Sequence, residues 1–129
     1  MDTCIDAGIT SDEKVRSYIE NHSFYNSFLK SASDYKHIDK GFALATFLWE
    51  TGNGKSELWL INNNPAGITC GKEYCIYQNQ EEGFIAMFTL LDTYVNDYGL
   101  HTIDEIRSLW SETNDSSDLV IMWKQILGG

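Results

Sequence analysis

Residues 41–56 read GFALATFLWETGNGKS, and this stretch decides how the chain folds. In the run that ends at Trp49, Thr46 is the one polar residue. A helix that is apolar on every side has to be buried, so we expect this one at the centre of the protein. Gly52 follows it, and glycine commonly ends helices. Glu50 is therefore expected at the end of a buried helix.

The last three residues of this stretch, Gly54-Lys55-Ser56, also end the phosphate-binding loop of many nucleotide-binding proteins. That loop requires another glycine five positions before Gly54, between a strand and a helix. Trp49 occupies that position, and the residues before it favour a helix. We therefore expect no nucleotide site, and interpret Gly52 and Gly54 as a helix end followed by a turn.

The rest of the chain is predicted to be mainly helical, because apolar residues recur at spacings of three and four. Thr10 and Thr102 each stand three residues before a glutamate, which is the pattern of a helix capping box. A longer apolar pattern runs from Glu81 to Tyr98. Besides the buried helix, helices are predicted to begin near Thr10, Ser23, Glu81, Thr102 and Ser116 or Ser117.

A small β hairpin is predicted in the middle of the chain. Residues 62–68, NNNPAGI, have the composition of a turn, and residues 68–69 can pair with residues 74–77. The fold class is thus mainly α (α+β), in one domain over residues 1–129. Cys70 and Cys75 flank the predicted hairpin turn. They form a disulfide if the protein works outside the cell, or remain two reduced thiols, and the spacing leaves both open.

Composition argues against several classes of partner. The formal net charge is −10, with 9 Lys+Arg against 19 Asp+Glu, which disfavours nucleic acid and anionic membrane surfaces. No apolar run approaches the roughly 20 residues of a membrane span, so we expect no membrane insertion. The N-terminal stretch lacks the features of a signal peptide, so we expect an excised domain or another route of export or release. The three histidines are scattered, and we expect no metal site and no cofactor.

Glu50 is the candidate acid. An apolar surrounding removes water from a carboxylate and so favours its protonated form. A protonated glutamic acid can give its proton to a leaving oxygen, which is what cleavage of a glycosidic bond requires. The alternative is a solvated glutamate at a helix end. A negative charge there opposes the helix dipole, which makes the position an unusual choice for an ordinary surface residue.

Three segments in this order resemble the bacterial glucosaminidases and lysozyme-like peptidoglycan hydrolases. In that family a buried helix ends in a motif like ALxETGWGKS, which stands here as ALATFLWETGNGKS at residues 43–56. A loop like NNLFGIK follows, here NNNPAGITC at residues 62–70. An aromatic element then precedes a long helix, here CIYQNQEEGFIAMFTLL at residues 75–91. The resemblance covers residues 40–100 and implies a lysozyme-like two-lobed domain.

The resemblance also implies roles for single residues. Glu50 would be the catalytic proton donor, and Tyr77 would line the site. Trp59, just after the turn that follows the acid, is our candidate among the tryptophans for stacking on a sugar. The resemblance further implies a cleft loop whose backbone meets the sugar, formed by Asn63, Asn64, Gly67 and Ile68.

A second carboxylate is needed for hydrolysis by either common route. It would stand about 5–5.5 Å from the acid in a retaining enzyme and about 6.5–9.5 Å in an inverting one. Glu73 in the predicted hairpin is the best match, and its alternative reading is a solvated turn residue. Glu81 and Glu82 look like first-turn helix charges. Without a second carboxylate, the acetamido or 6-hydroxyl group of the substrate would attack, and the latter gives lytic transglycosylation.

We therefore expect a glycoside hydrolase of the N-acetylglucosaminidase or muramidase type, cleaving a β-1,4 bond of bacterial peptidoglycan. It would act at the cell wall, as a monomer or a module of a larger wall-lytic protein, secreted or part of a phage lysin or virion tail. The alternatives are a lytic transglycosylase, a non-catalytic lysozyme-like protein for glycan binding or virion structure, and an inhibitor-type or adaptor domain. Two departures support a non-catalytic protein: Asn53 replaces the family's aromatic residue, and the family's YATDxxY segment is absent.

Overall fold

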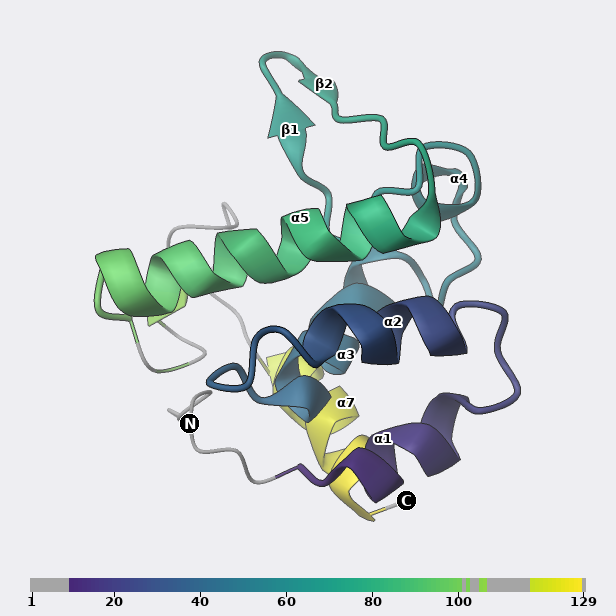
Figure 1. Cartoon of the computed structure of the whole chain (residues 1–129), viewed down its shortest axis with the longest axis vertical. Helices are drawn as coiled ribbons and strands as arrows, with labels where there is room; N and C mark the ends of the chain where they lie inside the picture. The colour runs from purple at the N-terminus through teal and green to yellow at the C-terminus, as the bar shows by residue number, and fades with distance from the viewer. Residues whose placement is uncertain (1–9, 101, 103–104, 107–116, 129) are drawn as a thin grey trace.

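The computed structural model describes residues 10–100, 102, 105–106 and 117–128. Within these ranges the chain is mainly helical, with a small β hairpin that stands clear of the packed helices at the top of Figure 1. The predicted fold class, mainly α with a hairpin, is confirmed at this level. No helix in the described ranges combines the length and apolar character needed to cross a membrane. The elements are α1 (Asp12–Ile19), α2 (Tyr25–Ala32), α3 (Lys40–Glu50), α4 (Glu57–Leu60), β1 (Thr69–Cys70), β2 (Glu73–Tyr74), α5 (Gln80–Asp92), η1 (Thr93–Asp97) and α7 (Ser117–Gly128).

Helix α3 forms the centre of the protein, as its apolar sequence predicts. Every residue from 41 to 48 is buried. Asp39 caps its N-terminus, where one carboxylate oxygen accepts a hydrogen bond from Phe42 N at 3.0 Å. Helix α7 packs along α3, and α1 packs against both. The last residues of α3 reach the surface below the hairpin, which fixes where Glu50 emerges.

The helix starts differ in detail from the predicted ones. Ser11, not Thr10, caps α1, accepting a hydrogen bond from Lys14 N. Thr10 instead bonds to buried Asp39, a partner 29 residues away that local spacing cannot reveal. Helix α2 begins at Tyr25 with no side-chain cap. At Thr102 one of the two hydrogen bonds of the predicted box is present, because the threonine hydroxyl accepts from Glu105 N. Most of the helix predicted to follow lies outside the described residues.

The predicted long helix from Glu81 to Tyr98 is two elements. Helix α5 begins one residue earlier, with the Asn79 side chain as its cap. From Thr93 the helix widens into the π-helical turn η1, where Tyr98 N donates to Thr93 O five residues earlier. No glycine or proline marks this change in the sequence.

An aromatic cluster joins α2, α3, α4 and α5. Phe47 and Phe84 lie 5.0 Å apart between ring centroids, and Trp59 lies 4.8 Å from each of them. Edge-to-face packing of this kind favours one fixed arrangement of the rings. The cluster therefore anchors short α4 to the longer helices. Its other members are Phe24, Phe28 and Phe88.

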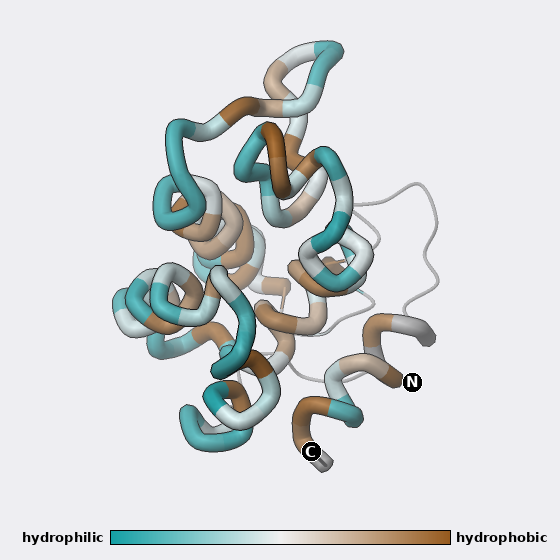
Figure 2. Tube along the Cα trace, turned by 90° about the vertical axis from the view of Figure 1, so that its right-hand side faces the viewer, coloured by the Kyte–Doolittle hydropathy of each residue, from teal (hydrophilic) through white to brown (hydrophobic). Residues whose placement is uncertain are grey.

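The hairpin is antiparallel, and Thr69 pairs with Tyr74 while Cys70 pairs with Glu73. Its two-residue turn begins at Gly71, whose φ of 74° a glycine adopts without strain. A disulfide joins Cys70 to Cys75, with the Cα atoms 4.9 Å apart. Hydrophobic residues come to the outside at this end of the molecule, toward the top of Figure 2. The exposed members are Leu60, Ile61, Tyr74 and Ile76.

Candidate functional site

Glu50 is the last residue of α3 and is half-buried, while Trp49 beside it is 43% exposed. The backbone then turns sharply through residues 52–54, all three of which have positive φ. Buried Thr51 holds this turn, because its hydroxyl donates to Phe47 O at 2.6 Å and accepts from Gly54 N at 2.9 Å. The carboxylate of Glu50 is thus fixed at the point where the buried helix meets the surface.

Gly67 brings the loop of residues 62–68 against this carboxylate. Its φ is 65°, a conformation that other residues rarely adopt. A Cβ on Gly67 would lie 3.5 Å from Glu50 Oε2 and 3.9 Å from a ring carbon of Tyr74. The acid, the loop and the hairpin therefore meet at Gly67. The Glu50–Gly67–Tyr74 cluster is our candidate site.

Asn64 is fully buried and organises the loop of residues 62–68. Its amide nitrogen donates to Ile68 O at 2.8 Å and Cys75 O at 3.0 Å. Its oxygen accepts from Ala66 N and Ile68 N. Ile68 O also accepts from Cys75 N, so both lone pairs of that carbonyl are used within the protein. Asn64 and Ile68 thus hold the loop, and Gly67 faces the acid; that the backbone of this loop meets a sugar stays a prediction.

Asn63 and Tyr77 tie the loop to the segment after the hairpin. Asn63, with a φ of 53°, donates from its side chain to Tyr77 O at 2.9 Å. Tyr77 N donates to Asn62 O at 2.8 Å. Partial burial, and then the nearby charge of Glu82, raise the pKa of the Tyr77 phenol above its usual value. Tyr77 thus remains a neutral hydroxyl across physiological pH. The tyrosine beside Gly67 is a different one, Tyr74.

The predicted second carboxylate, Glu73, lies exposed on β2. Successive side chains of a strand point to opposite faces, so Glu73 and Tyr74 project to opposite faces of the hairpin. Tyr74 faces Gly67. The hairpin therefore presents an aromatic ring toward Glu50, with Glu73 on the other face.

Trp59 is 1% exposed and belongs to the aromatic cluster, so the prediction that it stacks on a sugar is wrong. Four-residue α4 turns this side chain inward and leaves Leu60 exposed. Trp49 and Tyr74 instead carry exposed aromatic surface near the acid, at 43% and 55%. Tyr74 was not predicted as a site residue, although the sequence did indicate its pairing with the strand that follows the loop.

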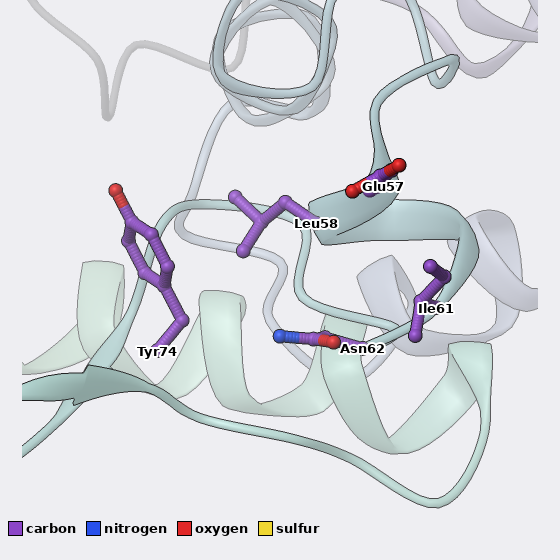
Figure 3. Close-up of a pocket in the computed structure, with 5 residues that line it drawn as sticks. All are labelled: Glu57, Leu58, Ile61, Asn62 and Tyr74. Atoms are coloured by element: carbon purple, nitrogen blue, oxygen red, sulfur yellow. The ribbon is translucent and has the colours of Figure 1, made fainter.

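A pocket of about 290 Å³ opens beside the Glu50–Gly67–Tyr74 cluster, with Tyr74 as a shared wall. Figure 3 shows Leu58 and Asn62 pointing toward the Tyr74 ring, with Ile61 at the opposite end. Glu57, the first residue of α4, lies above them. Glu57 was also missed, although it follows directly on the turn after the acid.

Comparison with known proteins assigns no family to the chain: no protein-family model matches it, and neither does any curated protein. Among the residues that the structure describes, no three His, Cys, Asp or Glu side chains are grouped to hold a metal ion. What the site offers chemically is one half-buried carboxyl group against Gly67, with exposed aromatic rings on Tyr74, near the same glycine, and on Trp49, the neighbour of Glu50 in the chain. Such a group can transfer a proton to a ligand bound against them.

Proposed function

We propose that the protein is a lysozyme-like enzyme that cleaves a β-1,4 bond of the glycan strand of bacterial peptidoglycan. One observation carries this proposal: Glu50 ends a buried helix and faces Gly67 and Tyr74 at the surface. The resemblance of residues 43–56, 62–70 and 75–91 to the wall-degrading family supports it. The protein would act at the bacterial cell wall, as a secreted module, a phage lysin or a virion tail component.

In the proposed reaction, the carboxyl group of Glu50 protonates the glycosidic oxygen as the bond to the leaving sugar breaks. Trp49 and Tyr74 stack on sugar rings on either side of the acid, because pyranose rings pack well on aromatic faces. Water, or the acetamido or 6-hydroxyl group of the substrate, attacks the anomeric carbon, and Glu50, now a carboxylate, takes up the proton that an attacking water or hydroxyl loses. Since Glu73 projects away from the Tyr74 face, attack by a substrate group becomes the favoured route, and the 6-hydroxyl would make the enzyme a lytic transglycosylase.

The test is digestion of purified peptidoglycan by the wild type and by Glu50→Gln, with products read by mass spectrometry. The glutamine keeps the shape of the side chain and cannot give up a proton, so products should fall by at least 100-fold. Glu20→Gln is the matched control, because Glu20 is the C-cap residue directly after α1 and is exposed. Reducing N-acetylglucosamine, reducing N-acetylmuramic acid or 1,6-anhydro ends would identify a glucosaminidase, a muramidase or a transglycosylase.

A non-catalytic glycan-binding protein is the second candidate, and Asn53 favours it. The family's aromatic residue at this position would give a further sugar platform, and here a small exposed amide with a φ of 63° stands instead. Equal binding of purified walls by the wild type and Glu50→Gln, with no products from either, would decide for this candidate.

A further inference from the structure

The pocket beside Tyr74 combines an aliphatic wall with a single acidic group. Leu58 and Ile61 supply aliphatic carbon, Tyr74 supplies an aromatic face, and Asn62 supplies one amide. Glu57 supplies the pocket's carboxylate and is exposed. Within the described part of the chain, the Glu57 carboxylate takes part in no ion pair. The pocket therefore offers an uncompensated negative charge at the edge of an apolar surface.

This lining suits an aliphatic chain that ends in a primary ammonium group. Methylene groups pack against Leu58, Ile61 and the Tyr74 ring, while the ammonium pairs with Glu57. The Tyr74 ring also attracts a cation placed over its face. The net charge of −10 draws cationic ligands toward the protein over a longer range.

The same lining fits a sugar ring poorly. A pyranose presents hydroxyl groups around its edge, and each needs a hydrogen-bonding partner when it leaves water. Two aliphatic side chains occupy much of this pocket, and its carboxylate can only accept hydrogen bonds when ionised. A fully apolar ligand would gain nothing from the Glu57 carboxylate, which would stay solvated.

We propose that this pocket binds the free side-chain amine of the diamino acid in a peptidoglycan stem peptide. The source of the ligand rests on the proposed function: a glycan strand bound at Glu50 would carry its peptide past Tyr74, the wall shared by site and pocket. Tyr74 then contacts the sugar and the peptide at once. The pocket makes the enzyme selective for walls whose stem amines are free.

The test is a titration of labelled protein, followed by NMR, with two synthetic stem tetrapeptides. One has lysine with a free side-chain amine at the third position, and its twin has that amine acetylated. The free amine should bind about two- to fivefold tighter, the range expected for one partly exposed ion pair. Shifts should concentrate on the Leu58 and Ile61 methyl groups and the Asn62 side-chain amide. High salt should reduce the preference.

Glu57→Gln should remove most of the preference for the free amine and leave only the part that the Tyr74 ring supplies, while the control Glu20→Gln keeps the full preference. Equal affinities in the wild type, an unchanged preference in Glu57→Gln, or shifts that avoid the pocket would each overturn the proposal. The titration needs no turnover, so it separates the two proposals. Wall digestion without an amine preference would leave the proposed function standing and remove this pocket's role. An amine preference without wall digestion would support the role of the pocket and remove the proposed function.

Discussion

At the scale of single residues, the site depends on what surrounds Glu50. Its position at the end of a buried helix was predictable, because the nine residues before it include one polar side chain. That Gly67 belongs to a loop of the site was expected only from the family resemblance, and its approach to the Glu50 carboxylate was not predicted. The role of Tyr74 was hidden, since it depends on a hairpin register that two-residue strands encode weakly.

Gly67→Ala tests whether the close approach of the loop to Glu50 matters. An alanine would have to adopt a φ of 65° and would place its Cβ 3.5 Å from Glu50 Oε2, on the side where a substrate would bind. We expect unfolding free energy to fall by about 1–2 kcal/mol. Wall digestion should fall on the order of 10- to 100-fold, as for a displaced catalytic group.

Gly99→Ala is the matched control for Gly67→Ala. Its φ is 68°, and a Cβ there would meet no atom within 4 Å. Both variants should lose similar stability in chemical denaturation, while only Gly67→Ala loses activity. Equal activity in the two variants would mean that Gly67 does not shape the site.

At the scale of elements, the loop of residues 62–68 shows where prediction from sequence stops. Its run of asparagines and Pro65 correctly indicated a turn. What each asparagine does was not predictable, because the partners of Asn64 include Cys75, eleven residues away on the far side of the hairpin. Within the same run, Asn64 is buried and holds the loop, whereas Asn62 lines the pocket.

Asn64→Asp tests this organising role with almost no change of shape. The new carboxylate can still accept from the backbone N–H groups of Ala66 and Ile68, but it cannot donate to the two carbonyls that the amide now reaches. Cys75 O loses this buried donor, and Ile68 O keeps only the hydrogen bond from Cys75 N, so unfolding free energy should fall by about 2–4 kcal/mol. Urea denaturation measures this, and Asn26→Asp, exposed on α2, should change stability by less than about 0.5 kcal/mol. A mild effect at Asn64 would show that the hairpin positions the loop without it.

At the scale of the whole molecule, helix content was predictable and helix packing was not. The spacing of apolar residues indicates which face of a helix is buried, but not against which neighbour. One contact between the segment before α1, the start of α3 and helix α7 depends on three side chains far apart in the chain. Thr10 Oγ1 donates to Asp39 at 2.7 Å and accepts from Trp123 Nε1 at 2.9 Å. From the sequence Thr10 was predicted to cap a helix, because its spacing from Glu13 is that of a capping box.

Thr10→Val tests whether this contact stabilises the whole protein. Valine has nearly the shape of threonine, so the packing around Gly41, whose missing side chain makes room for Thr10 and Trp123, is preserved. The indole N–H of Trp123 then has no acceptor in a buried position, and Asp39 loses one donor. We expect unfolding free energy to fall by about 2–3 kcal/mol. The control Thr89→Val removes an exposed hydroxyl that pairs with Tyr35, and should cost less than about 1 kcal/mol. If both variants unfold at the same urea concentration as the wild type, the hydrogen bonds of Thr10 contribute nothing to how α1, α3 and α7 are held together.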